Sequence, residues 1–84
     1  LKQNYPNPFN PTTSIRFDVT KASRMTLNIY DASGKLVQTL INNEVVPTGT
    51  NEVVFDAAKL SSGVYFYTLS SDSFRETKKM MLVK

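Results

Sequence analysis

Apolar and polar residues alternate along several short stretches of this chain, and turn-forming residues separate those stretches. Alternation at a period of two is typical of antiparallel strands that bury one face, and no stretch repeats its apolar residues with the period of a helix. The apolar members of the first two stretches are Ile15, Phe17 and Val19, and then Met25, Leu27 and Ile29. The pattern therefore predicts an all-β chain that begins with two strands.

A third strand is predicted over residues 36–41, but its phase is ambiguous. Leu36 and Leu40 favour one face of the strand, while Val37 and Ile41 favour the other. Such a pattern indicates either a β-bulge or a strand that is covered on both sides.

Turn formers divide the rest of the chain. A tight turn is predicted at Asp31–Gly34, because Asp accepts hydrogen bonds from the backbone that follows it and Gly adopts positive φ without steric cost. A loop is expected at 42–51, where Pro47 and Gly49 occur, with a short edge strand at 44–46. The remaining expected elements are a strand at 51–55, a single helical turn at 56–60 capped by Asp56, and a long hairpin formed by 64–70 and 74–83, with a turn at 71–73.

These elements predict an immunoglobulin-like antiparallel β-sandwich of about seven strands. Residues 1–84 have room for one core and are expected to be a single domain. Within it, 13–84 would form the sandwich and 1–12 a lead-in rich in Pro and Asn. Tyr65 follows Gly63 by two residues, a spacing that predicts a tyrosine corner, in which the hydroxyl bonds to the backbone just upstream.

The composition argues against several classes of function. The chain has no cysteine and no histidine, so it lacks disulfides, thiolate metal sites, the usual general base and the commonest zinc ligand. Its net charge of +3 is spread along the chain and does not form a nucleic-acid stripe. Four carboxylates sit at predicted strand ends and turns without the spacing of a calcium loop, namely Asp18, Asp31, Asp56 and Asp72. We therefore expect no enzyme activity, no metal, no cofactor, no nucleic acid and no small-molecule substrate.

The opening segment NYPNPFNP contains Pro6, Pro8 and Pro11. Each proline fixes φ and removes a backbone donor, so the segment is expected to be a stiff, unpaired lead-in. In one interpretation it is a structural loop, with Tyr5 and Phe9 tucked over one end of the sandwich. In a second, compatible interpretation it separates an upstream domain from the sandwich and exposes a peptide bond near or before the start of the chain. A polyproline-type ligand is a weaker third interpretation, because the aromatic residues lie inside the motif.

The last seven residues form a β-prone run with basic residues at both ends. They are Lys78, Lys79, Met80, Met81, Leu82, Val83 and Lys84. One interpretation is a final strand whose lysines guard a sheet edge against aggregation. The alternative is that part of this surface waits for a partner, because positions 80–83 are apolar on both faces.

Four motifs occur in a fixed order. They are QNYPNPFNP at Gln3–Pro11, IYDxxGKxV at Ile29–Val37, LSSGVYFYxL at Leu60–Leu69 and TKKMxLxK at Thr77–Lys84. In this respect the chain resembles the type A C-terminal sorting domain of the type IX secretion system. The family often has Trp or another large aromatic residue before an Asp-like residue near the middle, and here Phe55 takes that place before Asp56.

The resemblance implies a non-catalytic signal that directs an exported cargo through the periplasm and across the outer membrane to the cell surface or the medium. It implies three partners: the secretion translocon, a processing peptidase that acts in trans, and a cargo domain fused upstream. It also implies that the export signal lies in the final strand region, 78–84, and that the domain is open to removal on surface attachment. No signal peptide or membrane span is visible in the sequence. We expect the parent protein to carry its signal peptide far upstream and to end at Lys84.

A second class of function stays open at this point, which is an accessory adhesive or carbohydrate-binding module of a secreted enzyme. Tyr30, Tyr65, Phe66 and Tyr67 would supply the aromatic platform. Alternation along the strand sends Phe66 to the face opposite Tyr65 and Tyr67, which favours a core role for most of these rings. Fold alone does not choose between the two classes, because small sandwiches host many functions.

Overall fold

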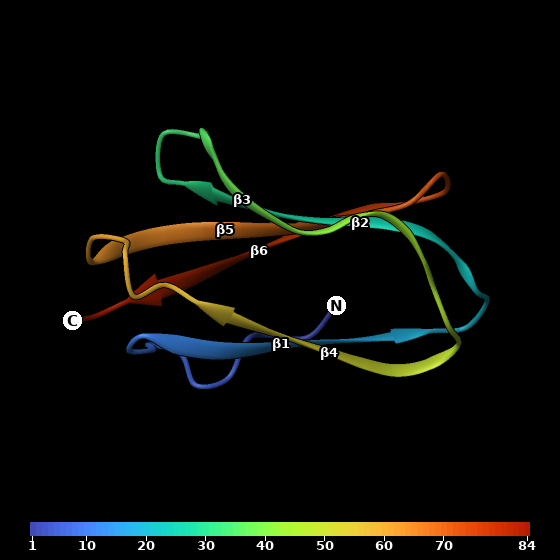
Figure 1. Cartoon of the computed structure of the whole chain (residues 1–84), viewed down its shortest axis with the longest axis horizontal. Helices are drawn as coiled ribbons and strands as arrows, with labels where there is room; N and C mark the ends of the chain where they lie inside the picture. The colour runs from blue at the N-terminus through green and yellow to red at the C-terminus, as the bar shows by residue number, and fades with distance from the viewer.

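The computed structural model describes residues 1–84 and contains six strands in two antiparallel sheets. The strands are β1 (Thr12–Val19), β2 (Ser23–Asp31), β3 (Leu36–Val46), β4 (Gly49–Asp56), β5 (Gly63–Ser70) and β6 (Arg75–Leu82). One sheet pairs β1 with β4, and the other has the order β3-β2-β5-β6. Figure 1 shows the sheets as two layers. The predicted all-β antiparallel sandwich is confirmed, with six strands in place of about seven. The structure holds no helix long and apolar enough to cross a membrane.

The core lies between the two sheets, where the alternating apolar residues of every strand meet. Fifteen buried apolar residues form one cluster: Phe9, Ile15, Phe17, Val19, Met25, Leu27, Ile29, Val46, Phe55, Ala57, Tyr65, Tyr67, Leu69, Met80 and Leu82. The rings of Phe9 and Phe55 lie 6.2 Å apart between centroids and are tilted by 56°, a favourable arrangement of two aromatic quadrupoles. One residue of the opening segment thus belongs to the same core as the strands.

The prediction of a loop at 42–51 was wrong, because β3 continues without a break to Val46. Its pairing with β2 shifts register at three points, and Asn43 has a φ of 51°. Of the two alternatives for the ambiguous phase, the structure therefore has bulges. These irregularities absorb extra residues, so Val46 still reaches the core and is 6% exposed. Only residues 47–48 separate β3 from β4, and there is no separate edge strand.

The turn between β2 and β3 is organised by the carboxylate of Asp31. Its Oδ1 accepts hydrogen bonds from the backbone N–H groups of Ser33 and Lys35, each over 3.0 Å, and from the Ser33 hydroxyl over 2.7 Å. Gly34 has a φ of 88°, which a residue with a side chain rarely adopts. Hydrogen bonds from Ser33 and from the Lys35 backbone hold the pKa of Asp31 below its ordinary value.

A second carboxylate caps the short connection between β4 and β5. Asp56 Oδ1 accepts from the backbone N–H of Ala58 over 2.9 Å, and the N–H of Leu60 donates to the carbonyl of Ala57 over 3.0 Å. The connection is one hydrogen-bonded turn, as the sequence indicates, and it brings the chain back to the start of β5.

Candidate functional site

The C-terminal strand β6 divides its residues between the core and the outer surface. Met80 and Leu82 point inward and are each 1% exposed, whereas Met81 and Val83 are 43% and 48% exposed. Lys79 shares the outward side with Met81 because side chains alternate along a strand. The run is apolar on both faces, as the sequence indicates, but only the outward residues are free to meet another molecule.

The lysines at the two ends of the run 78–84 have different surroundings. Lys78 is partly buried opposite Tyr67 on β5. At the other end, Lys84 folds back on the turn after β4, where its Nζ donates to the carbonyl of Ala58 over 2.6 Å and its backbone N–H to the Ser62 hydroxyl over 2.9 Å. Of the three lysines at 78, 79 and 84, Lys79 is the exposed one whose side chain has no hydrogen-bond partner.

The outer backbone edge of β6 is closed by the opening segment. The carbonyl of Met81 accepts from the N–H of Phe9 over 3.0 Å, and the N–H of Val83 donates to the carbonyl of Phe9 over 3.0 Å. The N–H of Met81 donates to Asn7 Oδ1 over 3.0 Å, and Gln3 Nε2 donates to the carbonyl of Lys79 over 2.8 Å. With β5 on its other side, β6 has no unpaired edge here for strand addition.

The same segment also pairs with β1 of the other sheet, so the expectation of an unpaired lead-in was wrong. Tyr5 exchanges two backbone hydrogen bonds with Ser14, over 3.0 and 2.9 Å, and the N–H of Lys2 donates to the carbonyl of Arg16 over 2.9 Å. The three prolines lack donors, but Tyr5, which precedes Pro6, and Phe9, which follows Pro8, retain theirs. The lead-in therefore joins the edge of β1 to the edge of β6.

Two of the lead-in prolines, Pro6 and Pro8, lie between the paired residues Tyr5 and Phe9, and Pro11 follows Phe9. Their peptide bonds, Tyr5-Pro6, Asn7-Pro8 and Asn10-Pro11, are all cis. Pro6 and Pro8 are exposed. The carbonyl of Pro6 accepts from the Thr13 hydroxyl over 2.9 Å, and the carbonyl of Pro11 accepts from the N–H of Ala57 over 2.8 Å. Prolines at 6 and 11 thus take part in the packing of the lead-in through their carbonyl oxygens.

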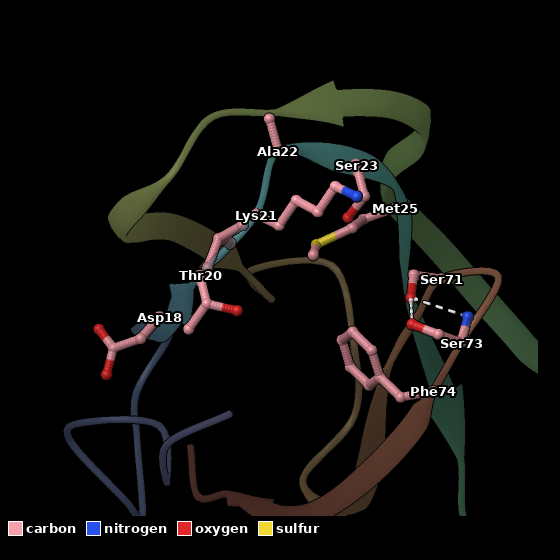
Figure 2. Close-up of a pocket in the computed structure, with 10 residues that line it drawn as sticks. Asp18, Thr20, Lys21, Ala22, Ser23, Met25, Ser71, Ser73 and Phe74 are labelled. Carbon is pink, nitrogen blue, oxygen red and sulfur yellow. Dashed lines mark hydrogen bonds between the residues drawn. The ribbon is translucent and has the colours of Figure 1, made fainter.

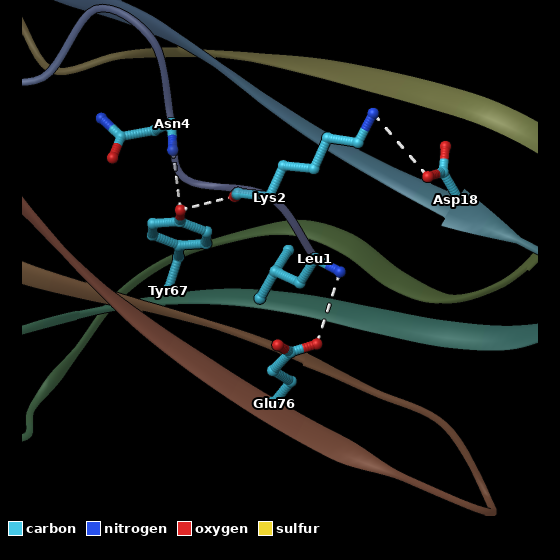
Figure 3. A network of polar contacts seen from close by, with 6 residues as sticks. All are labelled: Leu1, Lys2, Asn4, Asp18, Tyr67 and Glu76. Atoms are coloured by element: carbon cyan, nitrogen blue, oxygen red, sulfur yellow. Dashed lines mark hydrogen bonds and ion pairs between the residues drawn. The ribbon is translucent and has the colours of Figure 1, made fainter.

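A buried polar network fixes the lead-in to the core (Figure 3). The hydroxyl of Tyr67, which is fully buried, accepts from the N–H of Asn4 and donates to the carbonyl of Lys2, each over 2.8 Å. The buried Asn4 side chain donates to Thr13 Oγ1 over 3.0 Å. No buried side-chain polar atom is left without a partner, which is the condition under which a buried network stabilises a fold.

Burial of Tyr67 has an electrostatic consequence. Loss of the proton would place a charge in the apolar core, so burial raises the pKa of the Tyr67 hydroxyl above its ordinary value, against the opposing effect of the hydrogen bond from the Asn4 backbone. On the surface nearby, Lys2 Nζ lies 3.7 Å from Asp18 Oδ2 (Figure 3). A hydrogen bond from Thr50 and the charge of Lys2 lower the pKa of Asp18.

The sequence expectation placed both aromatic residues of the lead-in against the sandwich, but Tyr5 is 81% exposed and only Phe9 is buried. Asn4 points inward to reach Thr13, so its neighbour Tyr5 points outward along an extended backbone. Sequence reasoning missed Asn4, Thr13 and Tyr67 as lead-in anchors. A signal for Asn4 existed, because an amide side chain near a proline can supply donors where the proline has none, and Asn4 Nδ2 donates to the carbonyl of Pro6 over 3.2 Å.

At the start of β5, the hydroxyl of Tyr65 donates to the carbonyl of Ser61 over 2.7 Å. This is the bond that a tyrosine corner makes. Gly63 lies between the two residues with a φ of 153°, where a side chain would be strained although nothing occupies the space beside it. Tyr65 and Tyr67 are 7% and 0% exposed, so their rings do not form an aromatic platform for a sugar.

The largest hollow lies at one end of the sandwich, where the β1–β2 connection faces the β5–β6 turn (Figure 2). It measures about 320 Å³, and Lys21 and Thr20 lie across it from Phe74, Ser71 and Ser73. No three carboxylates gather anywhere as a metal site would require. The groups at this hollow are those of an ordinary polar surface with one exposed ring.

Comparison with known proteins identifies the fold and the family. The family described as "Secretion system C-terminal sorting domain" matches residues 3–84. No curated protein matches the chain. The structure is similar to a crystal structure of an uncharacterized protein from Bacillus anthracis str. Ames, with a TM-score of 0.66 and 13% identity over 88% of this chain and 72% of that one. At 13% identity, the similarity to this structure shows the fold alone.

Proposed function

This chain belongs to the family of secretion system C-terminal sorting domains, and we propose that its lead-in and its C-terminal strand act as one unit for recognition and processing. The domain is a sorting signal for type IX secretion: the machinery recognises it, and it directs an attached upstream cargo across the outer membrane to the cell surface or the extracellular space. In our proposal the translocon binds the folded domain in the periplasm, and a peptidase acting in trans then processes the cargo.

The proposed recognition signal is the run 78–84. The observation that supports it is the outward row of β6, in which Lys79, Met81 and Val83 are exposed while their neighbours Met80 and Leu82 are buried. Apolar side chains held outward on a strand that is fixed by pairing offer a fixed surface to a partner. We propose that the partner recognises side chains, because the backbone of Met81 is already bonded to the lead-in and β6 is paired with β5 on its other side.

We further propose that residues 1–84 act as one domain, with 1–12 as its lead-in and 13–84 as its sandwich. A peptidase needs an extended, unpaired stretch of backbone in its active site. The backbone of Lys2, Tyr5 and Phe9 is paired with the sheets, and the side chain of Leu1 is fully covered. If the cargo is released, the cut bond then lies before the docked lead-in.

The proposed mechanism involves binding and no catalysis by the domain itself. Its seven carboxylates are dispersed, and hydroxyl groups have no histidine or cysteine beside them to activate them. The chain needs no metal or cofactor for this role.

The test is export of a reporter that carries Leu1–Lys84 behind a signal peptide, in a host with type IX machinery. Deletion of 78–84 is expected to leave the reporter in the periplasm, but it also removes Met80 and Leu82 from the core. The sharper variant replaces Lys79, Met81 and Val83 with Ser. It should retain the melting temperature of the wild type within a few degrees and lose export.

The matched control replaces Lys21 and Val54 with Ser, since both are exposed and lie away from β6. It should be exported as well as the wild type. Equal export of the folded β6 variant and this control would refute the assignment of the signal to residues 78–84.

A further inference from the structure

A continuous row of side chains crosses the outer face of the four-stranded sheet. Leu36 on β3 lies opposite Tyr30 on β2, Tyr30 lies opposite Phe66 on β5, and Phe66 lies opposite Lys79 on β6. Beside this row, Val64 on β5 lies opposite Met81 on β6. Cross-strand neighbours on one face of a sheet are in contact distance, so these side chains form a single patch.

The patch faces outward, because the alternate residues of the same strands fill the core. Ile29, Tyr67 and Met80 are buried and are the sequence neighbours of Tyr30, Phe66 and Lys79 or Met81. Leu36 and Met81, at the two sides of the patch, are 50% and 43% exposed. Nothing in the fold lies over this face, whereas the opposite face of the same sheet is covered by β1 and β4 (Figure 1).

The charge on this face has one sign. The outward positions of β2, β5 and β6 carry three basic residues, Arg24, Arg75 and Lys79, and no carboxylate. None of the three takes part in an ion pair, since the ion pairs between side chains are Lys2–Asp18 and Arg16–Glu52. Lys79 adjoins the apolar patch, whereas Arg75 is separated from Lys79 by Thr77 on β6, and Arg24 is separated from Tyr30 by Thr26 and Asn28 on β2. The two arginines thus extend the positive charge toward the other end of the same face. An apolar patch with uncompensated positive charge on its face is complementary to an apolar surface bordered by carboxylates.

The small sheet, formed by β1 and β4, differs from the four-stranded sheet in that charged residues on its outer face take part in ion pairs. On its outer face, Arg16 Nε lies 2.8 Å from Glu52 Oε2, and Asp18 is paired with Lys2. A hydrogen bond from Arg16 and the positive charge of its guanidinium lower the pKa of Glu52 below its ordinary value. Charges on this face are thus compensated within the domain, and those of the four-stranded sheet are not.

We propose that the outer face of the β3-β2-β5-β6 sheet is a docking surface for one protein of the secretion machinery whose contact area is apolar and bordered by carboxylates. The proposal rests on the proposed function and extends the recognised surface beyond 78–84 to β2, β3 and β5. Tyr, Phe, Met and Arg are the residue types that protein interfaces favour, and this face carries all four. The patch is broad and mostly apolar, which fits a protein surface better than a nucleic acid backbone.

The experiment uses charge reversal outside the C-terminal run. Arg24→Glu combined with Arg75→Glu, in the full domain fused to the exported reporter, is expected to lower export by about tenfold, because like charges meet across the interface. Lys21→Glu is the control for the loss of positive charge, since Lys21 is exposed at the end of the sandwich, and it should export normally. Leu36→Ser tests the apolar side of the patch on β3 and should also reduce export.

The outcomes separate the two proposals. If the β6 variant of the previous section loses export while the Arg24/Arg75 and Leu36 variants retain it, the docking surface is refuted and the C-terminal signal stands. If none of these folded variants affects export, both proposals fall. Melting temperatures of the purified domains identify variants that fail to fold. Should the double charge reversal unfold the domain, Arg75→Glu alone decides.

A lipid partner would give a different result. Purified domain would then sediment with vesicles containing phosphatidylglycerol, and charge reversal would abolish this sedimentation while export by the folded variant continued. That outcome would overturn the proposal of a protein partner.

Discussion

The hydroxyl of Tyr67 donates a hydrogen bond to the carbonyl of Lys2 over 2.8 Å, which joins two residues that lie 65 positions apart in the chain. The same oxygen accepts from the N–H of Asn4. A side chain from the centre of the core therefore holds the backbone of the lead-in against both sheets. The backbone hydrogen bonds of Lys2, Tyr5 and Phe9 close the edges of β1 and β6, and this contact helps to hold them in place.

Tyr67→Phe should destabilise the domain by about 1–3 kcal/mol, because it leaves the N–H of Asn4 buried without a partner. Urea unfolding followed by circular dichroism measures this free energy of unfolding. Tyr5→Phe is the control, because the Tyr5 side chain is 81% exposed and its hydroxyl can bond to water. Equal unfolding midpoints for the two variants would contradict a role for Tyr67 as an anchor.

Stability should fall at alkaline pH through Tyr67. Burial raises the pKa of its hydroxyl in the folded state, so the folded chain keeps a proton that the unfolded chain loses above about pH 10. The contribution is fully present below that pH and is lost as the pH rises toward the folded-state pKa. Comparison with Tyr67→Phe isolates this contribution, because the two chains differ only in the Tyr67 hydroxyl.

The measurement is therefore the difference in unfolding free energy between wild type and Tyr67→Phe as a function of pH. We expect this difference to be constant near neutral pH and to shrink above about pH 10. A difference that stays constant to the alkaline limit of folding would show that Tyr67 ionises as easily in the folded state as in the unfolded state.

The ring of Tyr65 should contribute more to the stability of the domain than the hydrogen bond from its hydroxyl to Ser61. Tyr65→Phe removes one hydrogen bond and should cost about 1 kcal/mol, while Tyr65→Ala also opens a cavity and should cost about 3 kcal/mol or more. Gly63→Val should destabilise through backbone strain, since φ is 153° there. Thermal unfolding of the three variants tests the order, and an unchanged melting temperature in Tyr65→Ala would contradict it.

The closure of the β6 edge can be tested with two asparagines that each precede a proline. Asn7 accepts a hydrogen bond from the N–H of Met81, whereas Asn10 is exposed. Asn7→Ala should speed hydrogen exchange of the Met81 amide by about fivefold or more, which corresponds to the loss of one hydrogen bond. Asn10→Ala should leave that rate unchanged. Similar exchange rates in both variants would mean that the lead-in does not protect β6.

The local features of the fold could be predicted from the sequence because they depend on neighbouring residues. Alternation in 15–19 and 25–29 assigns the strands and their buried faces, since side chains alternate wherever the backbone is extended. The turn at Asp31–Gly34 follows from a carboxylate and a glycine within four positions. The family resemblance likewise depends on motifs that are continuous in the chain, and the match over residues 3–84 confirms it.

The extent of β3 could not be predicted in this way. Asn42 and Asn43 are turn formers, and the sequence indicates a loop there. The strand continues because β2 offers a partner through Val46, with bulges that absorb the extra residues. A competition between local turn preference and pairing with a distant strand has no signature in the local sequence.

The sequence by itself determined that the chain is an all-β sorting domain with a stiff lead-in and a final strand that is apolar on both faces. Only the tertiary structure decided that these two segments lie side by side and that Lys79, Met81 and Val83 face outward while Met80 and Leu82 fill the core. Proline chemistry acts within one residue and predicts stiffness, but the hydrogen bonds of Asn7 and Phe9 are made to residues more than 70 positions away. Such contacts arise from the packing of two sheets, because edges that are remote in the chain become neighbours only when the core forms.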